Sequence, residues 1–398
     1  MRYLISGYYG EKNAGDEAIL AGILQEVGRR DPQARFTVLS FNPEDTERRH
    51  GEGRQLEAIS TSLRSPARLR AAMRAADLLI SGGGSFLHEA DFELHGKSFW
   101  FRQGKLRPIP YFLSIVTLAK AQGLPVMWYA QGLGPLHTHS ARRLVARAAS
   151  AAQAVTWRDP ASARLAYEIG VRGVVQEVVP DPAYALVPSS TSQAEAELLS
   201  HGLADRRYLA VCPRPWLGRT GYLAGLGQAL DEAVAGLDVD ILLVPFHEIQ
   251  DPPVCEALAA RPALAGRARV LPPVDSPALL AAILGRAELV IAMRLHSGIL
   301  AATAGSPAVT VDYDPKTKAF ATQTRQSPWS VPVDELETGS TGLLDAVMQT
   351  LGELPARRAA LARAVAPLRA EAGRTAGLAV QLAANRGLGG PHAPEAGG

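Results

Sequence analysis

The residues best suited to chemistry lie in one stretch, "AELVIAMRLHSGILAATAGSPAVTVDYDPK", which covers residues 287–316. Its apolar runs predict a strand at 289–292 and a short helix at 297–304, with Arg294 and His296 in the turn between them. An arginine beside the free N–H groups of a helix N-terminus favours a bound anion. A histidine can also transfer a proton near neutral pH. The stretch therefore predicts an anion site with a general acid or base, and a purely structural histidine is the alternative.

Further groups that suit an anion follow other predicted strands or open the same helix. They are Ser297, Lys316, Arg158 and Arg214. Arg158 precedes Asp159 and a proline, which together signal the start of a helix. This placement favours anion binding by Arg158, and a salt bridge with Asp159 or Asp181 is the alternative.

A glycine loop near the start lies in "GYYGEKNAGDEAIL". Its last glycine is followed by the acidic residues Asp16 and Glu17, where a phosphate-binding loop would have a lysine. It lacks the glycine spacing of dinucleotide and P-loop sites, so the loop is weak evidence for nucleotide binding. We expect its helix to open at Ala18, with Asp16 as the N-cap. Asp16 and Glu17 would repel a phosphate but can accept hydrogen bonds from sugar hydroxyls, so we place them, with Asn13, on the acceptor side.

Three other strand-end loops carry candidate acceptor contacts. The loop "SGGGSFLHE" contributes Gly83 and Ser85, "YAQGLGP" contributes Gln131, and "PFHEIQD" contributes His247. The glycine loops can bring backbone N–H groups close to a ligand or serve as plain turns. The segments "HEADFELH" and "HTH" are weak candidates for metal binding, so we expect no metal and no cofactor.

Short apolar strands alternate with helices in both halves, which predicts α/β architecture with two Rossmann-like parallel-sheet domains facing a cleft. In such sheets ligands bind beyond the carboxyl ends of the strands. The expected divisions are an acceptor-side domain at 1–186, a linker at 187–207, a donor-side domain at 208–354, a helical segment at 355–385 and a disordered tail at 386–398.

Composition narrows the function classes. The 398 residues carry 41 Lys+Arg against 39 Asp+Glu, a net charge of +2 that gives no reason to expect a nucleic-acid partner. The two cysteines form no metal or disulfide spacing, which fits a reducing cytosol. No apolar run is long enough for a signal peptide or a membrane span, so we expect a cytoplasmic protein with at most peripheral contact to the inner face of the membrane.

Taken together and in order, "GYYGEKNAGDEAIL", "SGGGSFLHE", "QGLGP", "WRDPAS", "RPW", "RLHSGILAATAGSP" and "YDPK" resemble the polysaccharide pyruvyl transferases, and within them the CsaB type. The resemblance implies a fold like that of GT-B glycosyltransferases. It also implies transfer of pyruvate from phosphoenolpyruvate to N-acetylmannosamine of a lipid-linked cell-wall polymer, giving a 4,6-ketal that S-layer proteins recognise. Arg158, Arg294, His296 and Lys316 match family residues around phosphoenolpyruvate.

Two other function classes stay open at this stage. A nucleotide-sugar glycosyltransferase or epimerase of the same fold commonly carries a ribose-binding glutamate in the helix that here reads "SGILAATAG", which has none. A non-catalytic polysaccharide-binding protein would not need Arg294, His296 and Lys316 clustered. The oligomeric state is not predicted by any of these patterns.

Overall fold

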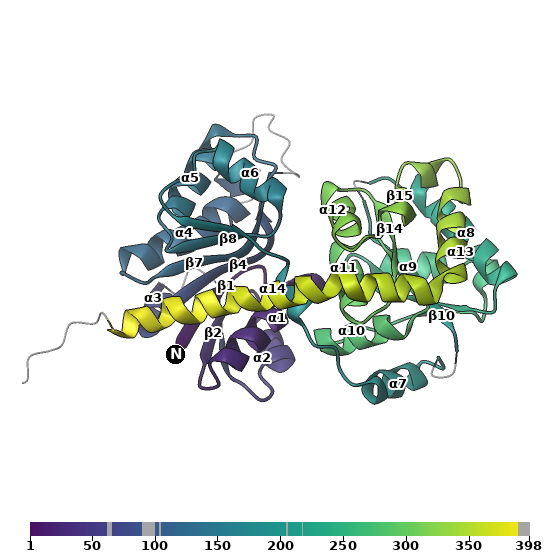
Figure 1. Ribbon diagram of the computed structural model, residues 1–398, viewed down its shortest axis with the longest axis horizontal. Helices are drawn as coiled ribbons and strands as arrows, with labels where there is room; N and C mark the ends of the chain where they lie inside the picture. Colours follow the sequence, from purple (N-terminus) through teal and green to yellow (C-terminus); the bar gives the residue numbers. More distant parts are fainter. Residues whose placement is uncertain (62–65, 90–99, 103–104, 204–205, 217, 389–398) are drawn as a thin grey trace, which may run out of the picture. The chain divides into compact units, whose positions relative to one another are not determined.

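The computed structural model of the protein describes residues 1–61, 66–89, 100–102, 105–203, 206–216 and 218–388. The chain divides into two compact units, and each contains residues from near the start (purple) and near the end (yellow) of the sequence in Figure 1. Unit 1 comprises Met1–Glu11, Ile23–Pro182 and Glu371–Gly398, and unit 2 comprises Lys12–Gly22 and Ala183–Ala370. Helices α1 (Ala14–Arg30) and α14 (Leu354–Leu388) therefore each contribute residues to both units.

Unit 1 is built on a parallel sheet with strand order β3-β2-β1-β4-β7-β8-β9. Its strands are β1 (Arg2–Ser6), β2 (Arg35–Ser40), β3 (Gln55–Ser60), β4 (Leu78–Leu87), β7 (Val126–Leu133), β8 (Ala154–Trp157) and β9 (Val175–Val178). Its helices are α2 (Pro43–His50), α3 (Pro66–Ala75), α4 (Pro108–Ala121), α5 (His139–Ser150) and α6 (Pro160–Glu168). A small antiparallel hairpin, β5 (Phe101–Arg102) with β6 (Lys105–Leu106), precedes α4.

Unit 2 repeats the architecture with strand order β12-β11-β10-β13-β14-β15, all parallel. Its strands are β10 (Tyr208–Cys212), β11 (Asp240–Leu243), β12 (Ala268–Val270), β13 (Leu289–Ala292), β14 (Ala308–Asp312) and β15 (Ser330–Pro332). Its helices are α7 (Thr191–Ser200), α8 (Gly221–Gly236), α9 (Pro252–Ala259), α10 (Pro277–Arg286), α11 (Leu295–Thr303), α12 (Pro315–Gln323) and α13 (Thr341–Gly352). The predicted fold class, two Rossmann-like parallel-sheet units, is confirmed.

The strands form where apolar residues run without interruption, as expected for parallel strands covered on both faces. The central strands β7, β8, β10 and β13 are buried along their whole length. Each unit has its own apolar core, which includes Trp128 and Trp157 in unit 1 and Leu209 and Ile291 in unit 2. In each sheet the helices follow the carboxyl ends of the strands, and the candidate polar residues lie at that edge.

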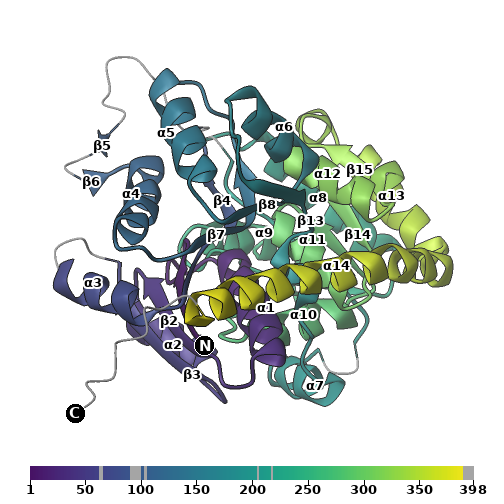
Figure 2. The same cartoon turned by 60° about the vertical axis from the view of Figure 1, so that its left-hand side comes forward.

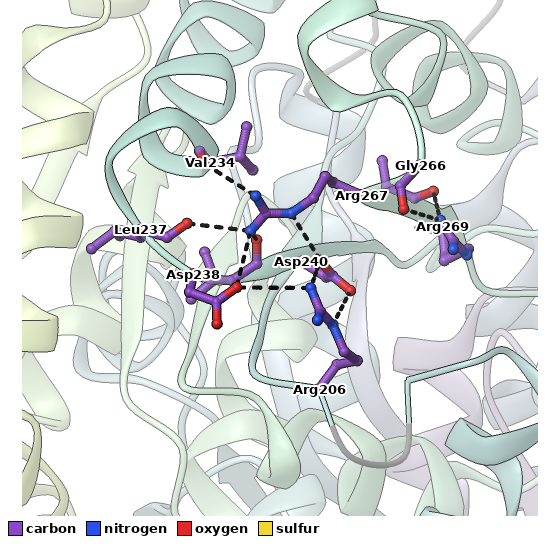
Figure 3. Close-up of polar contacts among 10 residues, drawn as sticks. Arg206, Val234, Leu237, Asp238, Asp240, Gly266, Arg267 and Arg269 are labelled. Atoms are coloured by element: carbon purple, nitrogen blue, oxygen red, sulfur yellow. Dashed lines mark hydrogen bonds and ion pairs between the residues drawn. The ribbon is translucent and has the colours of Figure 1, made fainter.

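At the opposite edge of the unit 2 sheet, arginines hold the strand starts together (Figure 3). Asp240, the first residue of β11, accepts two hydrogen bonds from Arg206 at 2.9 Å and one from Arg267 at 3.0 Å. Arg206 precedes β10 and Arg267 precedes β12, so one buried carboxylate links three adjacent strands. The hydrogen bonds from Arg206, followed by those from Arg267, hold the pKa of Asp240 below its usual range even though partial burial acts to raise it.

Three sequence expectations about elements need correction. Helix α1 begins at Ala14 rather than Ala18, and α11 begins at Leu295 rather than Ser297. The triple glycine after Ser81 is no turn before a helix but an irregular continuation of β4, whose register with β7 shifts between Gly84 and Leu87. Gly82 has a φ of +143°, and a Cβ there would lie 2.5 Å from the Tyr129 carbonyl oxygen, so this position needs glycine.

The expected linker and the expected tail differ from the prediction in smaller ways. The segment expected to be a linker, 187–207, contains helix α7, which opens with a capping box made by Ser190 and Gln193. Residues 386–388 of the expected tail complete α14, and 389–398 lie outside the described residues. No helix in the described part of the chain is both long enough and apolar enough to cross a membrane.

Candidate functional site

The main cluster in unit 2 is centred on Arg294, the N-cap residue of α11. The Nε of Arg294 donates to Oδ2 of Asp251 at 3.2 Å, and its Nη2 donates to Oδ1 at 2.5 Å. Asp251 has no exposed surface, and its Oδ2 also accepts the backbone N–H groups of Phe246 at 3.0 Å and His247 at 2.9 Å. The buried carboxylate thus fixes both the arginine and the loop after β11.

His296 lies in the first turn of α11, beside the N-terminal turn of α1. A Cβ built on Gly15 would lie 2.4 Å from Nδ1 of His296, so only glycine leaves room for the imidazole there. Ser297, the next residue of α11, is fully buried, and its hydroxyl donates to the Arg294 carbonyl oxygen at 2.6 Å. The N-terminus of α11 therefore brings together an arginine, a histidine and the positive end of the helix dipole, which suits an anion.

The glycine loop joins this same cluster through its backbone. The N–H of Ala14 donates to the Phe246 carbonyl oxygen at 2.8 Å, and the N–H of Glu248 donates to the Lys12 carbonyl oxygen at 3.0 Å. Asn13 forms an antiparallel bridge with His247. The loop directly follows β1 of unit 1 in the sequence, but residues 12–22 pack with unit 2.

The cap of α1 differs from the expected one. Asn13, not Asp16, precedes the helix, and its side-chain oxygen accepts the N–H of Gly15 at 3.1 Å. The Asn13 amide then donates to Oδ2 of Asp16 at 2.7 Å, so Asp16 supports the cap from the first turn. Asp16 is half-buried and Glu17 is 1% exposed. Asn13 thus links Asp16 and His247 at the N-terminal turn of α1, whose Gly15 lies against His296.

The pKa of His247 is shifted by its surroundings. Burial, assisted by the positive charge of Arg294, lowers the pKa of His247, while the carboxylates of Asp251 and Glu248 act against the shift. Its Nδ1 accepts the N–H of Ile249 at 3.3 Å. A neutral imidazole is therefore favoured here, suited to accept a hydrogen bond from a ligand hydroxyl.

A second cationic group follows β10 and β14 in unit 2. Nη1 of Arg214 donates to the Tyr313 hydroxyl at 2.7 Å, and the guanidinium carbon lies 4.7 Å from the Tyr313 ring centroid. Trp216 contacts the same ring edge-on, with centroids 6.1 Å apart. Lys316 stands in the first turn of α12, which is capped by Asp314. Sequence reasoning found Arg214 and Lys316 but missed Tyr313 and Trp216, although "RPW" and "DYDPK" place both next to predicted cations.

Unit 1 has a separate cluster after β8. Arg158 is 6% exposed, and its Nη1 lies 3.3 Å from Oδ2 of Asp181 while its Nη2 bonds to the Ser85 hydroxyl. The Gln131 amide donates to the carbonyl oxygens of Gly84 at 3.1 Å and Gly132 at 2.9 Å. The salt bridge weighed as an alternative for Arg158 is therefore present, with Asp181, and Asp159 caps α6 instead. Ser85, Gln131 and Arg158 lie together at the end of β4 and β7, where Gly83 is also found.

Among the described residues no group of three or more His, Cys, Asp and Glu side chains is arranged to hold a metal ion. Residues 90–95 of "HEADFELH" lie outside that part of the chain, and Glu89 accepts the N–H groups of His137 and Thr138, the two residues before α5. Cys212, at the end of β10, is fully buried, and burial raises the pKa of its thiol, so it is no nucleophile at neutral pH.

The paired parallel-sheet units are of the GT-B class. A structure of Alr3699/HepE from Anabaena in complex with UDP-glucose matches with a TM-score of 0.61 at 15% identity, over 96% of this chain and 99% of that one. UDP-GlcNAc 2-epimerase from Neisseria meningitidis bound to UDP-GlcNAc matches with a TM-score of 0.60 at 10% identity, over 97% and 100%. A glycosyltransferase from Rickettsia africae matches with a TM-score of 0.61 at 9% identity, over 98% and 99%. At these identities the likeness defines the fold and nothing finer.

The family of this chain follows from its sequence rather than from its fold. The model of the family described as polysaccharide pyruvyl transferase matches residues 13–315, which include the clusters around Arg294 and Arg158 and also Arg214 and Tyr313, but end one residue before Lys316. The chain therefore belongs to the polysaccharide pyruvyl transferase family and is an enzyme of that class.

Proposed function

We propose that this enzyme is of the CsaB type and transfers the pyruvyl group of phosphoenolpyruvate to a sugar of a lipid-linked cell-wall polysaccharide precursor. The proposed acceptor is N-acetylmannosamine, the product is its 4,6-ketal, and the modified polymer anchors S-layer proteins. The observation that carries the proposal is the pairing of Arg294 and His296 at the N-terminus of α11, within the matched family region. A cation, a proton carrier and a helix N-terminus are what a small, multiply charged anionic donor requires.

Phosphoenolpyruvate offers a carboxylate and a phosphate to be held. In unit 2 the proposed contacts are Arg214, Arg294, Ser297, Lys316 and the N–H groups that open α11. Arg158 is the proposed donor-binding cation of unit 1. Arginine suits planar, bidentate recognition of carboxylate and phosphate, whereas lysine acts as a point charge.

The reaction transfers two hydroxyl protons of the acceptor. One proton is delivered to C3 of phosphoenolpyruvate, which becomes the methyl group and leaves C2 oxocarbenium-like. One sugar hydroxyl attacks C2, the C2–O bond to phosphate breaks with the electron pair leaving on phosphate, and the second hydroxyl closes the ketal. The second proton leaves with phosphate. His296 is the proposed acid/base, because an imidazole can both give and take a proton at neutral pH.

The acceptor needs groups that accept hydrogen bonds from hydroxyls. The proposed contacts are Asn13, Asp16, Glu17, Gly83, Ser85, Gln131 and His247. In support, the lowered pKa of His247 favours the neutral, accepting imidazole. An acceptor carried by a lipid implies work in the cytoplasm, at the inner face of the cytoplasmic membrane.

The test is a phosphate-release assay with phosphoenolpyruvate and a soluble N-acetylmannosamine-containing acceptor, followed by mass spectrometry of the sugar. We expect phosphate release that depends on acceptor, and a product heavier by one pyruvate ketal. Thermal shift by phosphoenolpyruvate but not by UDP-sugars is expected in parallel. Turnover of a UDP-sugar without use of phosphoenolpyruvate would replace the proposal with a glycosyltransferase or epimerase.

A further inference from the structure

Tyr313 lies at the edge of unit 2 where three neighbouring strands end. Strand β13 pairs with β10 on one side and with β14 on the other, in a register that sets its last residue opposite Cys212 and Thr310. Arg214 and Arg294 each lie two residues beyond this level, and Tyr313 lies three residues beyond it. Figure 2 shows β13 and β14 together with α11 and α12, the helices that follow them. The parallel register thus brings a tyrosine and two arginines to the edge where such sheets bind ligands.

Arg214 differs from the other two arginines that we propose for the donor. Arg294 is ion-paired with Asp251, and Arg158 is ion-paired with Asp181. Within the described part of the chain, Arg214 forms no ion pair with any carboxylate. A carboxylate partner offsets part of the positive charge that an arginine presents to a ligand. Arg214 therefore presents more of its charge to an anion than either of the paired arginines.

Neutral groups hold the half-buried side chain of Arg214 instead. Its Nη1 donates to the Tyr313 hydroxyl at 2.7 Å, and its Nε donates to the Pro215 carbonyl oxygen at 3.2 Å. The guanidinium carbon also lies 4.7 Å from the Tyr313 ring centroid, close enough for a cation–π contact. Tyr313 thus fixes the guanidinium through both its hydroxyl and its ring, and adds no negative charge.

The Tyr313 ring is itself held by a chain of side chains. Trp216 contacts it edge-on, with centroids 6.1 Å apart, and the guanidinium carbon of Arg219 lies 4.3 Å from the Trp216 ring centroid. Arg219 is anchored in turn, since its Nη2 donates to Asp334 at 2.6 Å and its Nε donates to Glu337 at 2.8 Å. These contacts restrict the rotamer of Tyr313 and so the direction of its hydroxyl.

Tyr222 fixes the backbone of Arg214 from below. Its hydroxyl donates to the Arg214 carbonyl oxygen, and its side chain has no exposed surface. Burial raises the pKa of Tyr222 to about 12, and the positive charges of Arg214 and Arg294 act against that rise, whereas Asp251 adds to it. Both guanidiniums therefore lie within electrostatic reach of the same buried hydroxyl.

We propose that Tyr313 is a positioning residue, which holds the Arg214 guanidinium in place with its charge available to the anionic donor. Nη2 of Arg214 makes no hydrogen bond to the described residues, so it can donate to a carboxylate or phosphate together with the second N–H of Nη1. The inference deepens the proposed function and rests on it for the identity of the donor. It makes Arg214 the principal anion anchor of unit 2.

The test is calorimetric titration of the full-length protein with phosphoenolpyruvate and, separately, with inorganic phosphate, in the absence of acceptor. Tyr313→Phe removes the hydroxyl and keeps the ring, and is expected to weaken binding of both anions about tenfold, as for one lost hydrogen bond to a charged group. In steady-state kinetics this variant is expected to raise the Michaelis constant for phosphoenolpyruvate about tenfold and to keep kcat near the wild-type value, since ground-state binding is what changes.

The matched control is Tyr208→Phe, at the other end of β10. It also removes a buried hydroxyl, which donates to the Ile283 carbonyl oxygen at 2.6 Å. This variant is expected to lower the midpoint of thermal unfolding without changing the affinity for either anion. An equal loss of anion affinity in the two variants would show that removal of any buried hydroxyl from this sheet has the effect, and would overturn the proposal.

The double variant Arg214→Ala/Tyr313→Phe shows whether Tyr313 acts through Arg214. We expect it to bind phosphoenolpyruvate no more weakly than Arg214→Ala alone, because the hydroxyl then has no guanidinium to hold. Wild-type affinity in Tyr313→Phe, or additive losses in the double variant, overturns the proposal. Phosphate binding that Tyr313→Phe weakens, without any binding of phosphoenolpyruvate, would support the positioning role and overturn the proposed donor. Binding of neither anion by the wild type would overturn both.

Discussion

Asp251 holds Arg294 through both of its carboxylate oxygens, at 3.2 Å to Nε and 2.5 Å to Nη2. Oδ2 of this carboxylate also accepts two backbone N–H groups of the loop after β11. With no exposed surface on Asp251 and 12% on the Arg294 side chain, this pair is largely removed from water. The relationship makes Asp251 a positioning residue for the cation at the N-terminus of α11.

Asp251→Asn is therefore expected to affect both stability and donor binding. It leaves a largely buried guanidinium without its counter-charge, a loss of about 3–5 kcal/mol for buried pairs. Under the proposed function the Michaelis constant for phosphoenolpyruvate rises about tenfold or more, because Arg294 loses its fixed orientation. Urea unfolding and steady-state kinetics at saturating acceptor measure the two effects. A folded variant with wild-type kinetic constants would show that Asp251 has no positioning role.

His296→Ala is expected to abolish pyruvyl transfer while leaving the fold intact. Loss of a general acid/base reduces turnover by about 100-fold or more. Circular dichroism checks the fold, and phosphate release from phosphoenolpyruvate with acceptor checks the chemistry. His296→Gln distinguishes proton transfer from hydrogen bonding, because glutamine keeps polar side-chain atoms but cannot act as the acid. Phosphate release at the wild-type rate in the alanine variant would remove His296 from the mechanism.

Two glycines of α1 offer a matched pair. A Cβ at Gly15 would lie 2.4 Å from Nδ1 of His296, whereas nothing lies within 4 Å of a Cβ at Gly28. Gly15→Ala is therefore expected to displace the imidazole and lower turnover at least about tenfold, as small misplacements of catalytic groups do. Gly28→Ala is expected to keep full activity and to gain up to about 1 kcal/mol of stability from helix propensity. Equal activities of the two variants would contradict the placement of His296 beside α1.

The elements that the sequence predicted well are those set by local apolar runs. The strand Leu289–Ala292 lies where expected, because a continuous run of apolar residues marks it. The start of α1 was misplaced by four residues. An N-cap signal was present in Asn13, but Asp16 offered a competing one.

The grouping of site residues was harder to predict. Residues 12–22 pack with unit 2 through backbone hydrogen bonds to the loop after β11, and backbone contacts leave no pattern in side-chain types. Tyr313 was missed for a similar reason, since its contact with Arg214 joins residues that are 99 positions apart. Arg158 was expected at a strand end and is found there, but its bond to Ser85 depends on the irregular course of β4.

Arg158→Ala is expected to raise the Michaelis constant for phosphoenolpyruvate, if Arg158 binds the donor as proposed. The change also removes the ion-pair partner Arg158 from Asp181, a 3%-exposed carboxylate, so some loss of stability is expected. Arg158→Lys keeps the charge but not the planar fork, and is expected to restore stability more than donor affinity. Initial rates over a range of phosphoenolpyruvate concentrations, with thermal unfolding in parallel, separate the two roles. An unchanged Michaelis constant in the alanine variant would leave Arg158 with a structural role only.

The Asp240 cluster predicts a pH-dependent stability that does not involve the site (Figure 3). Because Arg206 and Arg267 hold the folded-state pKa of Asp240 below its usual range, the charged form contributes stability above the unfolded-state pKa of about 3.9. That contribution is lost as the pH falls from about 4 through the lower folded-state pKa. Asp240→Asn is therefore expected to cost about 1–3 kcal/mol at pH 7 and progressively less below pH 4.

The neighbouring Asp238 provides the control for this prediction. Its side chain is 87% exposed and lies 3.8 Å from both Arg206 and Arg267, so Asp238→Asn is expected to change the free energy of unfolding by less than about 0.5 kcal/mol. Urea unfolding of the wild type and both variants between pH 7 and pH 3 measures the difference. A cost for Asp240→Asn that stays constant down to pH 3, or an equal cost for Asp238→Asn, would show that the buried carboxylate does not link the three strands electrostatically.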